Sequence, residues 1–358
     1  MALVAGLALT TGCGRGQRGA GSPEGDTIPM AYAHNLVMVQ YADRIEVTMR
    51  DPWHEGRTLA RYTLTGDSTV HGEGVLHVPL RRAAVFTSVH CALLHELGAL
   101  DAVRGVCDLQ YMPLGYIHDG VKQGRISDLG NSMEPDMERL IDLMPDAVLR
   151  SPMEQSGAYG KIGRLSIPVV ECADYMEVSP LARAEWIRFY GRLVGQAERA
   201  DSIFARVDRR YTDLQGRAAL TSDRPRLICE APYNGQWYMP AGGSTMGRMY
   251  ADAGANYLFA DIPGTGSSPL SIEHVLERAL DADVWLIKTY GLQSRKQLVA
   301  DTPLLKGIRA QVWTCDPSVT GFYEETPFHP DLLLADLIAV LHPELGLSPT
   351  KRYFHSIP

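Results

Sequence analysis

The chain is poor in basic residues, and it has no internal apolar run long enough to cross a bilayer. Its 358 residues include 34 Lys and Arg against 42 Asp and Glu, which gives a formal net charge of -8. Nucleic-acid binding needs clustered Lys and Arg that neutralise phosphates, and a membrane-spanning helix needs about 20 consecutive apolar residues. The composition therefore argues against a nucleic-acid partner and an integral membrane protein, while the length suits two domains.

Cysteine is also scarce, and its spacing carries no metal or disulfide signature. After the first of the 6 Cys, the others stand far apart, mostly in or beside apolar, strand-like runs: Cys91, Cys107, Cys172, Cys229 and Cys315. Zinc sites and small disulfide-bonded domains use closely spaced pairs such as C-x-x-C. We therefore expect buried free thiols, no disulfide framework, no metal site and no cofactor.

The first residues have a different character from the rest of the chain. Ala2–Thr11 is apolar and leads into Gly12-Cys13, after which the sequence becomes polar and rich in glycine. This is the arrangement of a secretory signal with its cleavage site, and a Cys directly after Gly resembles the bacterial lipobox. We predict a lipoprotein signal peptide at residues 1–13, a lipid anchor on Cys13 and a flexible tether at residues 14–29.

Hydrophobic periodicity divides the remaining chain into two similar parts around a long helix. Alternating, strand-like stretches over residues 30–80 precede a strand–helix–strand pattern, and that pattern returns near the end of the chain. Strands that alternate with helices indicate a parallel sheet with covered faces. Between the two parts, apolar residues recur at helical spacing from Ser179, the predicted N-cap, to Arg217. We predict an N-terminal α/β lobe at 30–178, an interlobe helix at 179–217 and a C-terminal α/β lobe at 218–358.

An internal correspondence supports this pairing of lobes. Glu138 begins a helical stretch that leads into the Asp-led hydrophobic strand Ala147–Arg150. Glu273 begins a similar stretch that leads into the strand Val284–Lys288. Each unit is a helix followed by a hydrophobic strand that ends in a basic residue, which indicates two lobes of related construction.

An ordered series of segments resembles one known family. The segments are Pro79–Gly105, Ile126–Leu149, Ile167–Val170, AGGSTMGRMYADAGANYLF, PLSIEHVLERALDADVWLI and TPLLKGIRAQVWTCDP. Through them the chain resembles, from residue 30 to its end, the periplasmic iron-complex (siderophore) and vitamin B12 substrate-binding proteins of ABC importers. The resemblance implies an α/β fold in which two Rossmann-like lobes with central parallel sheets are joined by one long backbone α-helix.

The same resemblance implies partners and a location. Proteins of this family capture a small metal-chelate ligand and deliver it to the permease and ATPase of an ABC importer. The expected protein is a monomer in the cell envelope, anchored to the membrane by its N-terminal lipid and facing the periplasm. One surface carboxylate of each lobe docks onto the permease in this family, and the matching positions here are Glu138 and Glu273.

Candidate ligand-binding residues lie in the loops that leave the predicted strands, because ligands of open α/β sheets bind outside the carboxyl ends of the strands. They are His90, Tyr111, Met112 and Arg150 in the first lobe and Tyr238, Lys288, Tyr290 and Tyr323 in the second. Tyr and Met side chains offer broad, adaptable contact to a macrocycle or a catecholate. Arg150 and Lys288, at matching positions, would neutralise an anionic ferric complex.

These features together predict a lipid-anchored receptor for a ferric siderophore-type complex, with a cobalamin-type corrinoid or haem as alternative ligands. An enzyme is not expected. Ser244 is followed two positions later by Met246 where a nucleophile elbow requires Gly, so it does not form that motif, and His95-Glu96 lacks the second His of a zinc-protease motif. A lipid-anchored hydrolase with an unrecognised set of catalytic residues is the remote alternative.

Overall fold

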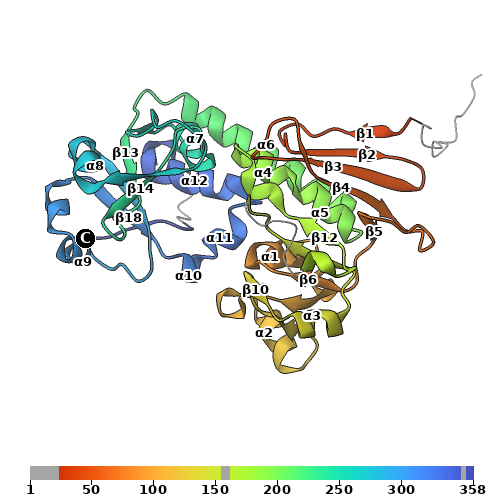
Figure 1. Ribbon diagram of the computed structural model, residues 1–358. Helices are drawn as coiled ribbons and strands as arrows, with labels where there is room; N and C mark the ends of the chain where they lie inside the picture. The colour runs from red at the N-terminus through yellow and green to blue at the C-terminus, as the bar shows by residue number, and fades with distance from the viewer. Residues whose placement is uncertain (1–23, 155–161, 348–351) are drawn as a thin grey trace, which may run out of the picture.

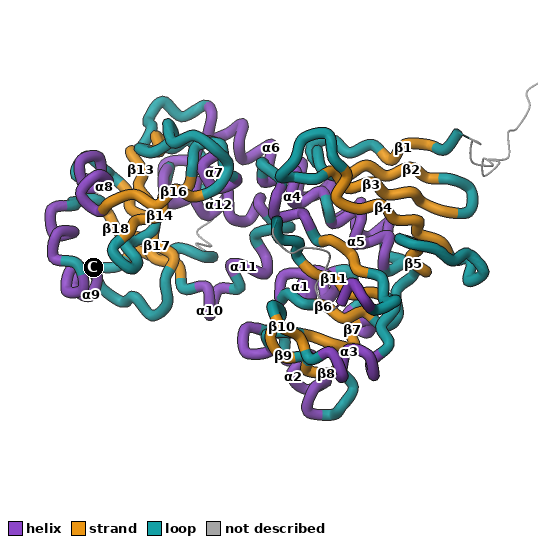
Figure 2. Tube along the Cα trace, viewed as in Figure 1, coloured by secondary structure: helices purple, strands orange, loops and turns teal. Residues whose placement is uncertain are grey.

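The computed structural model of the protein describes residues 24–154, 162–347 and 352–358, which form an N-terminal sheet and two α/β lobes (Figure 1). Figure 2 shows helices packed around the strands of each lobe and the N-terminal strands as a further layer beside the first lobe. The predicted α/β class is confirmed. The predicted signal peptide and Cys13 lie outside the described residues. Within those residues, no helix combines the length and apolarity that a membrane span requires.

The N-terminal sheet contains, in spatial order, β1 (Asp26–Ile28), β2 (Leu36–Gln40), β3 (Arg44–Arg50), β4 (Thr58–Thr65) and β5 (Val75–His77). Strands β1 to β4 pair antiparallel, as predicted, whereas β5 runs parallel to β4. The pairing of β1 with β2 corrects the predicted tether, because residues 26–28 belong to the sheet. Tyr62 links this sheet to the first lobe, since its hydroxyl donates to the carbonyl of Val169 at 3.0 Å.

The N lobe is built on a parallel sheet in the order β12-β11-β6-β7-β8. Its strands are β6 (Ala83–Val85), β7 (Val103–Val106), β8 (Ser127–Asp128), β11 (Ala147–Arg150) and β12 (Val169–Glu171). Its helices are α1 (Ser88–Glu96), α2 (Gly115–Lys122) and α3 (Met137–Leu143), and β9 (Gly130–Asn131) pairs with β10 (Glu134–Pro135) in a short hairpin. The central strands β6 and β11 are buried along almost their whole length, which is typical of a parallel sheet covered on both faces.

The C lobe repeats this construction with the sheet order β15-β13-β17-β18-β19. The strands are β13 (Arg226–Cys229), β15 (Asn256–Tyr257), β17 (Val284–Lys288), β18 (Gln311–Cys315) and β19 (His355–Ser356). Neighbours are parallel except for β19, which runs antiparallel to β18. The helices are α7 (Thr245–Asp252), α8 (Ile272–Ala279), α9 (Arg295–Asp301), α10 (Pro317–Thr320), α11 (Phe322–Glu325) and α12 (Pro330–Leu341). Outside the main sheet, β14 (Gln236–Pro240) pairs antiparallel with β16 (Ser267–Ser271).

A long helix joins the lobes, but its predicted start at Ser179 is wrong. The segment forms α4 (Pro180–Glu185), α5 (Ile187–Leu193) and, after a reversal, the long helix α6 (Ala197–Ala219). Gly195 has φ +71°, and the N–H of Gln196 donates to the carbonyl of Gly191 at 2.7 Å. A hydrogen bond of this kind beside a glycine in the left-handed conformation is typical of the C-terminal end of an α-helix. The chain then folds back, so that α6 packs along α5 on one side and along α12 of the C lobe on the other.

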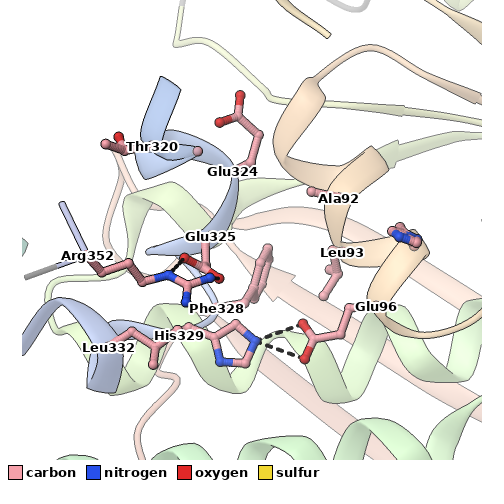
Figure 3. A pocket seen from close by; sticks show the side chains of 12 residues that line it. Ala92, Leu93, Glu96, Thr320, Glu324, Glu325, Phe328, His329, Leu332 and Arg352 are labelled. Atoms are coloured by element: carbon pink, nitrogen blue, oxygen red, sulfur yellow. Dashed lines mark hydrogen bonds and ion pairs between the residues drawn. The ribbon is translucent and has the colours of Figure 1, made fainter. Parts of the chain in front are cut away.

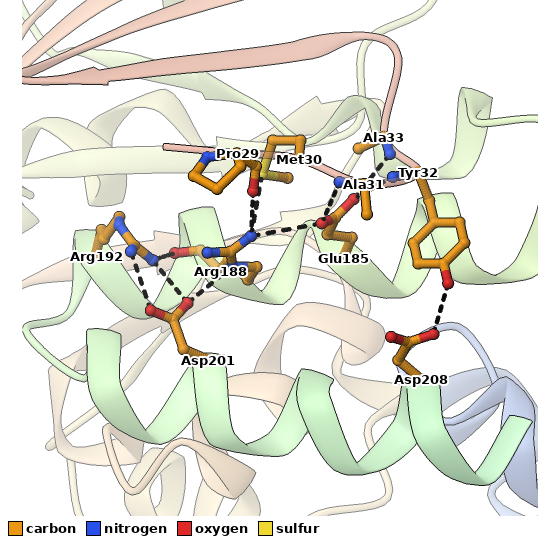
Figure 4. A network of polar contacts seen from close by, with 10 residues as sticks. All are labelled: Pro29, Met30, Ala31, Tyr32, Ala33, Glu185, Arg188, Arg192, Asp201 and Asp208. Carbon is orange, nitrogen blue, oxygen red and sulfur yellow. Dashed lines mark hydrogen bonds and ion pairs between the residues drawn. The ribbon is translucent and has the colours of Figure 1, made fainter. Parts of the chain in front are cut away.

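The reversal is held by a network of charges in which the N-terminal residues take part (Figure 4). The buried carboxylate of Glu185 accepts the backbone N–H groups of Ala31, Tyr32 and Ala33 at 2.8–2.9 Å. Asp201, at the start of α6, accepts hydrogen bonds from Arg188 at 2.9 Å and from both terminal nitrogens of Arg192 at 3.1 Å. These bonds fasten α5 to α6 and the N-terminal segment to α4, so the N lobe is rigidly attached to the connecting helix.

Candidate functional site

The carboxyl ends of the two parallel sheets meet between the lobes. Ser88 is the first residue of α1, which follows β6. Its hydroxyl donates to Glu324 of α11 at 2.8 Å. Figure 1 shows α11 beside α1, and the two helices are in contact. A second bond joins the lobes where Thr245 donates to the carbonyl of Glu177 at 3.2 Å. We call the segments that follow β6, β7, β8, β11 and β12 in the N lobe, and β13, β17 and β18 in the C lobe, the strand-end surface.

Large apolar and aromatic side chains are exposed on the strand-end surface. Tyr111 and Tyr290 are 71% and 69% exposed. The other exposed side chains of this kind on the surface are Met133, Met153, Tyr175, Tyr233, Tyr238, Val319 and Tyr323. A concentration of exposed apolar side chains on a folded protein marks an interaction site, and tyrosine combines an apolar ring with a polar tip. Four predicted residues, Tyr111, Tyr238, Tyr290 and Tyr323, are therefore exposed on this surface, and their contact with a ligand stays a prediction.

Two cavities lie at or beside this surface. The first, of about 570 Å³, is between α1 of the N lobe and α11–α12 of the C lobe. Figure 3 shows two charged pairs among its side chains, Glu96 with His329 at 2.9 Å and Glu325 with Arg352. The second, of about 400 Å³, is in the C lobe and is lined by Tyr290 and neighbouring loop residues. The first cavity is thus part of the interlobe contact, and the second opens beside an exposed tyrosine.

The prediction that His90 contacts a ligand is corrected by its position in the core. The side chain is 3% exposed, and its Nε2 lies 2.9 Å from Asp174 and 3.1 Å from the hydroxyl of Tyr190. Burial alone would lower the pKa of His90, but the interactions with Cys172 and Asp174 outweigh it and raise the pKa to about 10. Burial likewise opposes ionisation of Asp174, yet His90 and Arg183 hold the pKa of Asp174 at about 2. His90 therefore belongs to a buried ionic network.

Met112 is also corrected, because it is 3% exposed and packs into the core while its neighbour Tyr111 points to solvent. Both residues end a 3₁₀ turn, Leu109–Tyr111, that follows β7. The backbone carbonyl of Met112 lies 2.6 Å from Nε2 of His118. The side chain of Met112 thus stabilises the loop that carries Tyr111.

The two predicted cations occupy matching positions in the structure. Arg150 ends β11, and the sheet register places it beside Glu171 of β12. Lys288 ends β17, and its ammonium group forms an ion pair with Glu230, the residue after β13. Burial by itself would lower the pKa of Lys288, but Glu230 raises it above the ordinary value, so the ammonium stays charged. The charge of Lys288 is consequently compensated within the protein.

The predicted docking residues are placed as a matched pair. Glu138 lies in the first turn of α3, whose N-cap is Asp136, and Glu273 lies in the first turn of α8, whose N-cap is Ser271. Both glutamates are exposed. Each helix leads into a central strand of its sheet, β11 or β17. The docking role itself stays a prediction.

Several exposed residues of the surface escaped the sequence-based prediction. Tyr175 and Tyr233 each follow a predicted strand within a few residues, so the same strand-end reasoning would have found them. Val319 lies just beyond β18 and is 80% exposed, and it was equally accessible to that reasoning. Met133 is different, because it sits in the β9–β10 hairpin, whose strands are too short to give a sequence signal.

The described residues contain no cluster of His, Cys, Asp and Glu suited to holding a metal ion. In the same part of the chain, the five cysteines are buried and unbridged, and burial raises the pKa of the Cys91 and Cys229 thiols to about 12. The protein chemistry of the site is accordingly that of aromatic rings, hydroxyls and paired charges.

Comparison with known proteins shows where this arrangement occurs. Residues 84–312 match the family described as periplasmic binding protein. An uncharacterized lipoprotein of Methanocaldococcus jannaschii is 26% identical over 292 residues, which cover 78% of this chain and 69% of the relative.

Solved structures share the fold at low sequence identity. A periplasmic haem-binding protein from Pseudomonas aeruginosa has a TM-score of 0.59 and 18% identity, covering 78% of this chain and 98% of that chain. An Fe³⁺-hydroxamate transport protein from Saccharomonospora viridis has a TM-score of 0.56 and 19% identity, covering 82% and 98%. A periplasmic vitamin B12 binding protein of Vibrio cholerae has a TM-score of 0.54 and 15% identity, covering 75% and 98%.

Proposed function

Because the chain belongs to the periplasmic binding protein family of ABC-type transport, we propose that it captures a ferric siderophore-type complex between its lobes and delivers it to an importer. The observation that carries this proposal is the strand-end surface, on which both lobes expose tyrosines. Tyr111 comes from the N lobe, and Tyr238, Tyr290 and Tyr323 come from the C lobe. A bulky, partly apolar chelate placed between the lobes would bury these rings on both sides.

A corrinoid is the second candidate ligand. One observation favours it: the ammonium of Lys288 is compensated by Glu230, so the C-lobe side of the surface offers no uncompensated positive charge from this residue to an anionic chelate. Haem is the third candidate, and its only support is the similarity of the fold to that of the haem-binding protein. The three ligands have different visible spectra, so the absorbance of protein purified from its native host distinguishes them.

The proposal extends to the anchor and the partner. The relative named a lipoprotein supports a lipid-anchored form attached through Cys13, working as a monomer in the cell envelope and facing the periplasm. The exposed glutamates Glu138 and Glu273 would dock onto the permease, one from each lobe, and ligand transfer would be driven by the ATPase of that importer.

Tyrosine substitutions test the ligand site directly. Tyr111→Ala and Tyr290→Ala should each weaken binding of a ferric trihydroxamate about tenfold, since a buried interface tyrosine commonly contributes roughly 1–2 kcal/mol. Isothermal titration calorimetry measures this loss. Leu220→Ala is the matched control, because Leu220 is 87% exposed at the end of α6, away from the strand ends. Equal affinities of all three variants and the unaltered protein would contradict a ligand site on the strand-end surface.

A further inference from the structure

Glu230 and Lys288 meet at the carboxyl edge of the C-lobe sheet. Lys288 is the last residue of β17, and Glu230 directly follows the neighbouring strand β13. The backbone N–H of Glu230 continues the ladder by donating to the carbonyl of Leu286 at 2.8 Å. This bond brings the two side chains side by side, and they form an ion pair.

Both side chains are largely enclosed, with Lys288 13% and Glu230 22% exposed. The ammonium of Lys288 also lies 5.9 Å from the centre of the Phe322 ring. An enclosed pair of opposite charges interacts more strongly than an exposed pair, because less water screens it. The lysine is therefore held by the protein rather than left available to a ligand.

The backbone of Glu230 is held in an uncommon conformation. Its φ is +61°, in the left-handed region that residues other than glycine adopt rarely. The indole N–H of Trp285 donates to the carbonyl of Glu230 at 2.7 Å and fixes this geometry. The conformation directs the chain away from β13 just at the strand end, where the carboxylate faces Lys288.

Exposed tyrosines of the C lobe lie near this pair. Lys288, Glu230 and Tyr290 are all close enough to Tyr323 to affect its ionisation: burial, Glu230 and Tyr290 raise the pKa of Tyr323, whereas Lys288 lowers it. The ion pair therefore lies beside tyrosines that we assign to ligand contact.

We propose that Glu230 is a specificity-determining residue, which cancels the positive charge of Lys288 and so selects metal chelates without net negative charge. This inference rests on the proposed function and narrows its ligand class. A neutral ferric trihydroxamate or a corrinoid meets a surface of matched charge here. An anionic ferric tricatecholate would be repelled by the carboxylate of Glu230, because the positive charge of Lys288 is already neutralised. Repulsion between like charges at an interface weakens the binding of an unsuitable ligand.

The test compares two probes, a neutral ferric trihydroxamate and an anionic ferric tricatecholate, by isothermal titration calorimetry on the full chain. The unaltered protein should prefer the neutral chelate. Glu230→Gln should raise the affinity for the anionic chelate about tenfold or more, because it leaves the Lys288 charge uncompensated, and it should leave the neutral chelate within about twofold. Glu277→Gln is the matched control, because it removes one negative charge from a side chain of α8 that is 76% exposed.

A double variant keeps the test decisive if Glu230→Gln folds poorly. Glu230→Gln combined with Lys288→Gln removes both charges, and it should restore the chelate preference of the unaltered protein. A preference of the unaltered protein for the anionic chelate overturns the inference while leaving the proposed function intact, and so does an unchanged ratio in Glu230→Gln. Binding of neither chelate overturns the proposed function, and this inference with it.

Discussion

At the amino ends of their central strands, the two lobes use the same device. Asp146, just before β11, accepts the backbone N–H groups of Arg81 and Arg82 at 2.6 and 2.8 Å. Asp283, just before β17, accepts the backbone N–H of Arg226 at 2.9 Å. Each aspartate ties the start of one strand to a neighbouring strand or the segment before it, and both lobes share this structural feature.

At the carboxyl ends the lobes differ. Both lobes place charged residues at a strand end, Arg150 beside Glu171 in the N lobe and Lys288 paired with Glu230 in the C lobe. Behind its strand ends the N lobe also buries the network of His90, Asp174 and Tyr190, which joins it to α5. The lobes therefore differ in this buried network and not in the presence of charge at the strand ends.

The largest expected effect concerns a feature that the lobes share. If Glu138 and Glu273 dock the two lobes onto the permease, changing both to Lys should abolish stimulation of the importer's ATPase and leave ligand affinity unchanged, because both side chains are exposed and away from the strand ends. Each single variant should lose part of the stimulation. The measurement is ATP hydrolysis by the importer in liposomes.

Glu277→Lys is the matched control for docking, because Glu277 is on the same helix as Glu273 and is exposed. It should keep full stimulation. Full stimulation by the double variant would remove these glutamates from the docking surface, and a loss in one single variant alone would show that the lobes contribute unequally.

A second prediction tests the buried network of the N lobe. Asp174→Asn should lower the free energy of unfolding by about 3–5 kcal/mol, because it leaves His90 and Arg183 without their buried partner. Urea unfolding measures the change. Asp142→Asn, at an exposed position of α3, should stay within about 0.5 kcal/mol of the unaltered protein. A cost for Asp174→Asn no larger than that of the control would refute a stabilising role for the network.

The same network predicts how stability depends on pH. The pKa of His90 is raised from 6.5 to about 10, so its contribution is complete below pH 6.5 and is lost as the pH rises through 10. The pKa of Asp174 is lowered from 3.8 to about 2, so its contribution is complete above pH 3.8 and is lost as the pH falls through 2. The advantage of the unaltered protein over Asp174→Asn should therefore shrink between pH 6.5 and 10, while the part that Arg183 provides through Asp174 remains.

Much of the fold could be predicted from the sequence, because long periodic segments determine their own structure. The strands predicted at Ala147–Arg150 and Val284–Lys288 agree with β11 and β17 of the structure. The predicted start of the long helix was wrong. Gly195 is a residue type that often ends a helix, but apolar residues continue at helical spacing through the reversal, and this spacing predicted one unbroken helix. The strand β19 was missed because it consists of two residues and exists through its pairing with β18.

The candidate site could be predicted less well, because burial is decided by tertiary packing. The strand-end rule selected segments in which the four predicted tyrosines are exposed, and their role in ligand binding stays a prediction. It could not distinguish Tyr111 from the buried Met112 next to it. It identified Lys288 as a cation but could not find Glu230, which is far away in the sequence and is brought alongside by the pairing of β13 with β17.

The smallest expected effect concerns the contact between the lobes. Glu96 of α1 accepts a hydrogen bond from His329, which precedes α12, at 2.9 Å, so this ion pair joins the N lobe to the C lobe. Burial alone would lower the pKa of His329, but Asp331 and Glu96 raise it from 6.5 to about 9. The pair is therefore complete below pH 6.5 and is lost as the pH rises through 9. Its side chains are 21% and 30% exposed, so its contribution should be below about 1 kcal/mol.

Glu96→Gln should therefore broaden the distribution of distances between the lobes at pH 6, as measured by single-molecule energy transfer between labels on α3 and α8. The unaltered protein should show the same broadening at pH 9.5. Glu325→Gln is the matched control, since Glu325 lines the same cavity but pairs with Arg352 within the C lobe, and it should leave the distribution unchanged. If Glu96→Gln behaves like this control, the lobes are held together by the bond between Ser88 and Glu324 and by the packing of α6 rather than by this ion pair.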